Sequence, residues 1–255
     1  MTVVGEGDEP VDDHSVAARL AATAGELLLE LRRGSLSGRS LGAEGDRQSN
    51  ELLLRALATL RPGDAVLSEE AQDDRSRLSA RRVWIIDPLD GTREYGEDGR
   101  SDWAVHVALW EDGALAAGSV ALPAQGLVLR DDQPPALSGA ASPPRLVVSR
   151  SRPPAVADEV AAALGAVRVP MGSAGAKVAA VVLGEAEAYV HAGGQYEWDS
   201  AAPVAVAGAA GLHVSRLDGS PLRYNQPDVL LPDLVVCRPE LAAAVLAAAA
   251  GSHPV

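Results

Sequence analysis

Residues 83–92 read V-W-I-I-D-P-L-D-G-T, and this stretch says most about the fold and function of the chain. The apolar residues 83–86 predict a buried strand, which Pro88 is expected to stop because proline has no backbone N–H and restricts its neighbour. Asp87 and Asp90 then share one rigid turn, where two like charges at short range perturb each other's pKa unless a cation compensates them. Carboxylate oxygens are preferred ligands of magnesium and calcium. The stretch therefore predicts an all-oxygen cation site at a strand end.

The next two residues predict a phosphate site beside that cation. Gly91 lets another group approach the backbone, and Thr92 offers a hydroxyl and an amide N–H. If a helix begins here, its free N–H groups can bind an anion. The hexapeptide D-P-L-D-G-T is also explained by an ordinary strand-ending turn, with Asp87 and Asp90 as turn formers.

Other acidic residues follow or precede expected elements in the same way. Glu69 and Glu70 come directly after the short apolar run 65–67, which predicts a strand. Asp199 stands at the start of an alanine-rich helix, and Asp46 stands just ahead of an amphipathic segment. Because aspartate is a common helix N-cap, capping explains Asp46 and Asp199 as well as a functional role does.

Composition limits the classes of protein that the chain can belong to. No stretch of 18 apolar residues occurs, so no membrane span is expected, and residues 1–15 are acidic and polar, unlike a signal peptide. The single cysteine, Cys237, excludes an internal disulfide, suits a reducing cytoplasm and is expected in a buried strand. A net charge of −13 argues against nucleic-acid polymers and anionic membranes as partners. An acidic cleft that binds an anionic substrate would need cations to invert its local charge.

The pattern of apolar residues predicts alternating strands and helices, which favours α/β layering. Helices are expected at residues 15–33, 47–60, 155–164, 174–183, 200–210 and 241–250. Strands are expected at residues 65–67, 83–86, 103–110, 114–122, 146–149, 188–191, near 213 and at 234–236.

Three segments are expected to lack regular structure. Residues 34–45 are rich in glycine and serine and predict a mobile loop or hairpin that carries Asp46. Residues 73–82 are charged and predict a surface loop. Residues 131–144 are rich in proline, alanine and serine, which predicts an N-terminal domain at 1–140 and a C-terminal domain at 141–255.

Five motifs in this order resemble the inositol monophosphatase superfamily of magnesium-dependent, lithium-sensitive phosphatases. They are G-D-R-Q-S-N at 45–50, L-S-E-E at 67–70, W-I-I-D-P-L-D-G-T-R-E at 84–94, G-S-A-G-A-K at 172–177 and E-W-D-S-A-A-P at 197–203. The P-L-R-Y-N string at 221–225 is most similar to the CysQ-type branch, whose members act on 3'-phosphoadenosine 5'-phosphate. The resemblance covers residues from about 46 to 237 and implies the layered αβαβα sandwich of the inositol monophosphatase and fructose-1,6-bisphosphatase type.

The resemblance also implies a set of magnesium ligands. The first ion would be held by Glu69, Asp87 and the backbone carbonyl of Leu89, and the second by Asp87, Asp90 and Asp199. One ion would activate water and the other would neutralise the leaving oxygen.

Catalytic and substrate roles follow from the same resemblance. Glu69 and Thr92 would orient the attacking water, and Asp46 would position water or a third, loosely held cation. The substrate-binding set would be Glu69, Asp90, Gly91, Thr92, Arg93, Ser173, Lys177 and Asp199.

Substrate specificity is less strongly encoded. Lys177 is the only lysine in the chain, and with Ser173 it would face a second phosphate or a ribose, although its survival in an arginine-rich chain can also be chance. Arg93 can bind substrate charge or pair with Glu94. Two further pairs of residues complete the expectations: His106 and His191 as hydrogen-bonded core residues, and Tyr196 and Glu197 as contacts to a sugar.

Three functions fit these expectations. The first is a magnesium-dependent 3'(2'),5'-bisphosphate nucleotidase that converts 3'-phosphoadenosine 5'-phosphate to AMP and phosphate in sulfate assimilation. The second is a broader phosphatase for inositol 1-phosphate or fructose 1,6-bisphosphate, and the third is a metal-binding regulatory module without turnover. All three imply a small phosphate ester or a metal as the partner, and a homodimer stays open.

Overall fold

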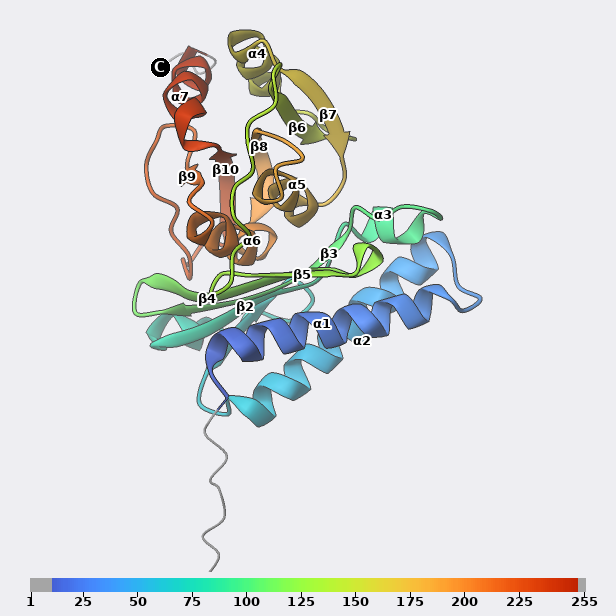
Figure 1. The fold of residues 1–255 in the computed structure, drawn as a ribbon. Helices are drawn as coiled ribbons and strands as arrows, with labels where there is room; N and C mark the ends of the chain where they lie inside the picture. Colours follow the sequence, from blue (N-terminus) through green and yellow to red (C-terminus); the bar gives the residue numbers. More distant parts are fainter. Residues whose placement is uncertain (1–10, 252–255) are drawn as a thin grey trace, which may run out of the picture.

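The computed structural model describes residues 11–251, which form five alternating layers of helices and sheets (Figure 1). The first sheet has the strand order β1-β2-β3-β4-β5, and the second has the order β7-β6-β8-β10-β9. The strands are β1 (Ala65–Ser68), β2 (Arg82–Asp90), β3 (Ala104–Glu111), β4 (Ala114–Leu122), β5 (Leu127–Arg130), β6 (Arg145–Ser149), β7 (Val167–Met171), β8 (Ala188–Tyr196), β9 (His213–Ser215) and β10 (Leu230–Cys237). The helices are α1 (Asp13–Arg32), α2 (Gly38–Leu60), α3 (Thr92–Gly96), α4 (Ala155–Leu164), α5 (Ala174–Val182), α6 (Glu197–Ala209) and α7 (Ala242–Gly251), with short 3-10 turns at Arg75–Ser79, Pro123–Gln125 and Pro239–Leu241.

The outer layers are amphipathic helices that each cover one face of a sheet. Helices α1 and α2 pack on the first sheet through side chains spaced three and four residues apart, such as Val16, Leu20 and Leu28. Helices α4 and α7 cover the outer face of the second sheet. The α/β layering that the residue pattern favours and the αβαβα sandwich that the resemblance implies are confirmed.

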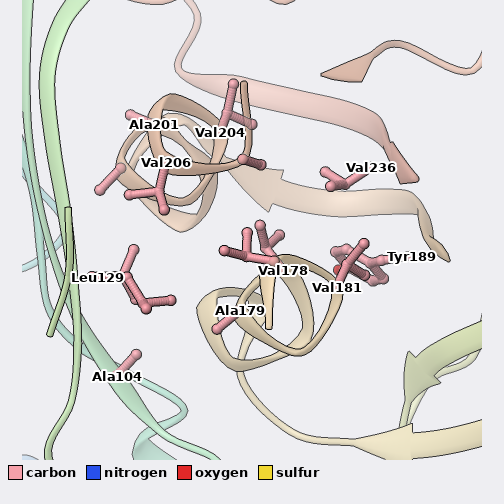
Figure 2. Packing of buried hydrophobic residues seen from close by; sticks show 14 of the residues in the cluster. Ala104, Leu129, Val178, Ala179, Val181, Tyr189, Ala201, Val204, Val206 and Val236 are labelled. Carbon is pink, nitrogen blue, oxygen red and sulfur yellow. The ribbon is translucent and has the colours of Figure 1, made fainter. Parts of the chain in front are cut away.

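The middle layer consists of α5 and α6, which lie between the two sheets (Figure 2). Every residue of α5 is buried, because a helix between two sheets has no face left for solvent. Figure 2 shows Val181 of α5 beside Tyr189 of the second sheet, while Leu129 of the first sheet faces the other side of this layer. Alanine and valine suit this layer because their small side chains let both sheets approach.

The glycine-rich segment 34–45 is mostly helix, so the prediction of a loop or hairpin is wrong. Helix α2 begins at Gly38, and Asp46 therefore lies inside the helix and cannot be its N-cap. The glycines serve close packing: a Cβ at Gly42 would lie 2.7 Å from Thr92 Cγ2, and a Cβ at Gly45 would lie 2.8 Å from the Tyr95 ring. Helix propensity alone could not show this, because the benefit comes from α3 and β2, which pack against the glycines.

The charged segment 73–82 contains a buried residue that the surface-loop prediction missed. Arg77 has no exposed area, and its guanidinium donates to Asp73 and to Asn225 Oδ1 at 2.7 Å. This segment therefore ties the first sheet to the chain ahead of β10. A buried arginine is stable only when its donors are matched in this way.

Most expected elements are confirmed within one to several residues, including the β3–β4 hairpin and the burial of Cys237 in β10. The short strands β5 and β7 were missed. The sheets occupy residues 65–130 and 145–237, and the proposed division into domains 1–140 and 141–255, whose ends lie outside the described residues, stays a prediction. Among residues 11–251, no helix is long and apolar enough to cross a membrane.

Candidate active site

The site begins where β2 departs from regular pairing with β3. Asp87 pairs with His106 and Asp90 pairs with Ala104, and the register shifts between these two pairs. The strand therefore continues through Pro88 as a bulge, and the expectation that proline would end it is wrong. Pro88 fits the bulge because no ladder hydrogen bond is needed there.

Local hydrogen bonds fix the conformation of this bulge. Ser49 Oγ of α2 donates to the Pro88 carbonyl at 2.7 Å, and Leu89 N donates to Asp87 Oδ1 at 3.0 Å. Gly91 then adopts φ 86°, a left-handed conformation that favours glycine, and α3 begins at Thr92. The backbone thus aims Asp87 and Asp90 into one region with little conformational freedom.

Helix α6 brings Asp199 to the same place. Tyr196 is the N-cap of α6, and Asp199 lies in its first turn, where its Oδ2 accepts a hydrogen bond from Tyr196 N at 2.6 Å. Asp199 is therefore not the N-cap itself, but it caps α6 from the third position of a capping box, so the predicted capping role is confirmed in this form and its ligand role stays a prediction. One carboxylate oxygen from each of Asp87, Asp90 and Asp199 lies within 4.8 Å of the other two.

This crowding perturbs the acids strongly. Burial, followed by the charges of Glu69 and Asp90, raises the pKa of Asp87 well above its usual value. Burial and then the charge of Asp90 raise the pKa of Asp199 to about 6. Although Glu69 keeps more than a third of its surface exposed, desolvation of its carboxyl and then the charge of Asp199 raise its pKa to about 8. The cluster therefore needs positive charge to be fully ionised at neutral pH.

The donor set fits a hard divalent cation. Oxygen ligands lie roughly 2.0–2.6 Å from magnesium or calcium, so one ion can bridge carboxylates at this spacing. Asp87, Asp90 and Asp199 supply oxygen only, and no thiol takes part, since the one cysteine is buried in β10. Buried carboxylates on rigid elements are the kind of ligand that magnesium accepts.

Asp46 and Thr92 form a second corner of the site. Thr92 Oγ1 lies 3.3 Å from Asp46 Oδ1 and 3.2 Å from the Leu89 carbonyl, which places the hydroxyl between two acceptors. Burial, then the charge of Glu70, raises the pKa of Asp46 to about 7. The contact between Gly42 and Thr92 holds α2 and α3 close enough for Asp46 to reach this hydroxyl.

Asp90 also contacts the first turn of α5. Its carboxylate accepts hydrogen bonds from Ser173 Oγ, from Ala174 N at 3.1 Å and from Gly175 N at 2.6 Å. Burial works to raise the pKa of Asp90, but His106 and the Ser173 hydroxyl outweigh it and hold the pKa below its usual value. The Ser173 hydroxyl thus donates to Asp90, and because Ser173 also lines the cavity beside it, its contact with a substrate stays a prediction.

A cavity of about 590 Å³ opens beside Asp90 and Asp199. Lys177, buried in its wall, donates to the carbonyls of Gly172 and Ser173, and burial lowers its pKa despite the nearby charge of Asp90. An ammonium group has three donors, so one is left for a ligand in the cavity. Other polar residues that line the cavity are Arg93, Glu94, Ser149, Ser151, Arg152, Ser173, Tyr189, His191 and Gln195.

The ion pairs around this cavity decide one of the open expectations, the pairing of Arg93 with Glu94. Glu94 pairs with Arg150 at 2.6 Å rather than with Arg93. Among the described residues Arg93 and Arg152 have no ion-pair partner, although the chain is strongly acidic. Arg152 was not anticipated as a site residue, because no motif surrounds it.

Two other residues near the site, His191 and Glu197, differ from expectation. His191 is not in the core but lines the cavity, with Nε2 2.7 Å from the Gly193 carbonyl, and burial lowers its pKa to about 4. Glu197 is fully buried and accepts from the backbone N–H groups of Asn225 and Gln226, so it is a structural group rather than a sugar contact. Tyr196 is exposed and stacks on Trp198, and its contact with a sugar stays a prediction.

His106 was expected to be an ordinary core residue. It is fully buried in β3, but its Nε2 lies 3.3 Å from Asp90 Oδ2, and its Nδ1 lies 3.0 Å from the Trp198 carbonyl. No local sequence pattern marks His106 as a site residue. Its place opposite Asp87 follows from the register of β2 and β3, which only the structure reveals.

The inositol monophosphatase family model matches residues 10–253, so the chain belongs to the inositol monophosphatase family. This is a family of metal-dependent phosphatases that act on small phosphate esters. A relative from Mycobacterium leprae named 3'-phosphoadenosine 5'-phosphate phosphatase is 55% identical over 249 residues, which is 92% of each chain.

Two further relatives are more distant. The 3'(2'),5'-bisphosphate nucleotidase CysQ of Escherichia coli is 30% identical and aligns with 84% of this chain and 94% of its own. The crystal structure of CysQ from Bacteroides thetaiotaomicron superposes with a TM-score of 0.75 at 25% identity, over 89% of this chain and 97% of that one.

Proposed function

We propose that this protein is a magnesium-dependent phosphatase that removes the 3'-phosphate of 3'-phosphoadenosine 5'-phosphate and releases AMP and phosphate. The observation that carries the proposal is the cavity beside Asp90 and Asp199, whose walls hold Lys177 and the two unpaired arginines Arg93 and Arg152. A substrate with two phosphates needs one cationic region beyond the reaction centre, whereas an inositol monophosphate does not. The name of the relative at 55% identity supports the same substrate.

The chain's own residues suggest how the substrate is held. The scissile phosphate would lie over Asp87, Asp90 and Asp199, with the N–H groups of Gly91 and Thr92 toward its oxygens. When bound, magnesium at Glu69, Asp87, the Leu89 carbonyl, Asp90 and Asp199 would activate water and offset the charge that develops on the phosphate.

The second phosphate would lie in the cavity, bound by Lys177 and Arg152. Arginine offers a planar, two-pronged donor for phosphate, and the lysine adds a desolvated point charge. Arg93 lies between this cavity and a smaller opening lined by Asp46 and Thr92, so it can contact either end of the substrate.

The attacking water would lie on the Thr92 side of the centre. The Thr92 hydroxyl is within hydrogen-bonding distance of Asp46, and Glu69 directly follows β1, close enough for its charge to act on Asp87. Glu69, Thr92 and Asp46 together would orient the water for in-line attack.

The proposal includes a cellular role. By removing 3'-phosphoadenosine 5'-phosphate the enzyme would act in sulfate assimilation in the cytoplasm, and sensitivity to lithium belongs to the same proposal. Each of these follows from the resemblance to the CysQ-type branch.

The test is a substrate panel with the purified full-length protein. Phosphate release should require magnesium, and kcat/KM should be highest for 3'-phosphoadenosine 5'-phosphate among that nucleotide, inositol 1-phosphate and fructose 1,6-bisphosphate. Lys177→Met should lower kcat/KM for the bisphosphate far more than for inositol 1-phosphate, while Arg19→Ala on the exposed face of α1 should change neither. A more than tenfold preference for inositol 1-phosphate would reverse the substrate assignment.

The remaining alternative, a regulatory module without turnover, is separated by the same assay. Such a module needs the carboxylates but no positioned water, so Thr92→Ala would leave it intact. Release of phosphate by the wild type, and its loss in Thr92→Ala, would exclude that alternative.

A further inference from the structure

His106 is a buried ionisable residue at the site to which the proposed reaction gives no role. It lies on β3 directly opposite Asp87, has no exposed area, and is packed beneath the cluster of Asp87, Asp90 and Asp199. An apolar residue would fill such a position without the cost of burying two ring nitrogens. The contacts of the two ring nitrogens therefore show what His106 contributes to the site.

The two nitrogens of His106 face two different elements. Nδ1 lies 3.0 Å from the carbonyl of Trp198, and because a carbonyl oxygen only accepts, Nδ1 is the donor. Nε2 lies 3.3 Å from Asp90 Oδ2, in contact with the carboxylate but without a hydrogen bond of good geometry. The ring therefore sits between a carboxylate on β2 and the first turn of α6, which carries Asp199.

Gly175 of α5 leaves the space that the His106 ring occupies. A Cβ at Gly175 would lie 2.0 Å from His106 Nε2, so any larger residue there would displace the imidazole or move α5. The N–H of the same Gly175 donates to Asp90 Oδ2. A change at Gly175 would therefore disturb both the position of the His106 ring and the hydrogen bond that Asp90 accepts from α5.

We propose that His106 is a positioning residue that holds Asp90 and the first turn of α6 at the separation needed for Asp90 and Asp199 to bind one divalent cation. The proposal rests on the cation centre of the proposed function but not on the identity of the substrate. His106 would act through its contact with Asp90 and its hydrogen bond to the Trp198 carbonyl, as groups that surround metal ligands generally do. Simple core packing is the competing explanation, and it predicts loss of stability without a specific loss of cation affinity.

The test measures binding of Mn²⁺ alone to the full-length protein without substrate, by electron paramagnetic resonance of the free ion and by calorimetry. Manganese suits the same carboxylate ligands as magnesium and gives a direct signal. His106→Leu keeps the bulk of the ring but neither polar contact, and it should raise the dissociation constant for Mn²⁺ about 10- to 100-fold. His106→Asn, which can still donate to the Trp198 carbonyl, and His106→Gln, whose amide can reach Asp90, should each fall between leucine and the wild type.

A double-mutant cycle with Gly175 adds a readout that packing alone would not produce. Gly175→Ala should weaken Mn²⁺ binding by displacing the ring, whereas the pair Gly175→Ala with His106→Ala should bind no more weakly than His106→Ala by itself. The matched control is Ser119→Ala on β4, which removes a buried hydrogen bond of 3.0 Å to the Leu129 carbonyl on the neighbouring strand. It should lower the melting temperature and leave Mn²⁺ affinity within twofold.

The outcomes separate cleanly. Mn²⁺ affinity within twofold of the wild type in His106→Leu, or losses in all variants that merely follow their melting temperatures as in Ser119→Ala, would overturn the proposal. Weakened binding in His106→Leu with intermediate values for asparagine and glutamine would support it. That support would stand even if the wild type released no phosphate from 3'-phosphoadenosine 5'-phosphate, a result that would count against the proposed function alone.

Discussion

Replacing Asp199 with asparagine is expected to stabilise the cation-free protein while it removes the activity. Burial and the charge of Asp90 raise the pKa of Asp199 from 3.8 to about 6. A shift of roughly two units corresponds to about 3 kcal/mol at a pH where the group is ionised in both states. Asparagine avoids this cost and keeps a side-chain oxygen to accept the hydrogen bond from Tyr196 N.

The sign of the pH dependence follows from the raised pKa. The folded protein holds the Asp199 proton more tightly than the unfolded chain, so its stability falls as the pH rises from about 4 through about 6. The gain in Asp199→Asn should therefore be close to zero near pH 4 and reach up to about 3 kcal/mol near pH 8. For a chain of this size, that corresponds to an increase of roughly 5–10 °C in melting temperature.

The assay is thermal unfolding in a chelator at about pH 4.5, 6 and 8, together with phosphate release in magnesium. Asp98→Asn, in an exposed loop after α3, is the matched control and should show no pH-dependent gain. Equal destabilisation of Asp199→Asn at every pH would refute the idea that the ionised Asp199 carboxylate destabilises the cation-free protein. Retained activity would remove Asp199 from the ligand set.

Three further predictions follow from other contacts. Magnesium should raise the melting temperature more near pH 8 than near pH 6. The reason is that the pKa of Glu69 is raised to about 8, so protons compete with the cation for this carboxylate at lower pH. Thermal unfolding with and without magnesium measures the difference. Gly42→Ala should lower kcat and cost about 1–3 kcal/mol, because its Cβ would lie 2.7 Å from Thr92 Cγ2 and push α2 off α3; steady-state kinetics and denaturant unfolding test both effects. Arg77→Ala should lower the free energy of unfolding by about 3 kcal/mol, since Asn225 and Asp73 lose their buried partner; urea unfolding measures it.

These predictions have matched controls in the chain. Gly63→Ala, where a Cβ meets nothing within 4 Å, should leave kinetics and stability unchanged. Arg223→Ala, at an exposed position, should cost far less than Arg77→Ala. Equal magnesium effects at both pH values, a silent Gly42→Ala, or equal effects of the two arginine variants would each count against the respective contact.

Helices and strands whose own residues show a clear apolar periodicity could be predicted from the sequence. The helix at 155–164 and the hairpin of β3 and β4 have clear apolar periodicity, and the structure has them at nearly the expected bounds. The acids of the D-P-L-D-G-T turn and Asp199 were expected to meet, and the structure brings them within 4.8 Å. Their roles as ligands stay predictions.

Features that depend on a partner element could not be predicted in this way. The glycines of α2 read as a loop until α3 and β2 are packed against them. Arg77 reads as a surface charge until Asn225, far along the chain, lies beside it. His106 reads as a core residue until the strand register places it opposite Asp87. In each case the deciding interaction is with a residue distant in sequence, which local periodicity does not report.

The hydrogen bonds that Asp90 accepts from the start of α5 join residues that are synthesised far apart in time. Asp46, Glu69, Asp87 and Asp90 all leave the ribosome before the donors at residues 172–175 and before Asp199. A nascent or truncated chain that ends near residue 140 would hold most of the negative charge of the centre without the groups that relieve it. A chain that stops before residue 172 would therefore lack the donors to Asp90 as well as Asp199, and it could not assemble the cluster of three acids.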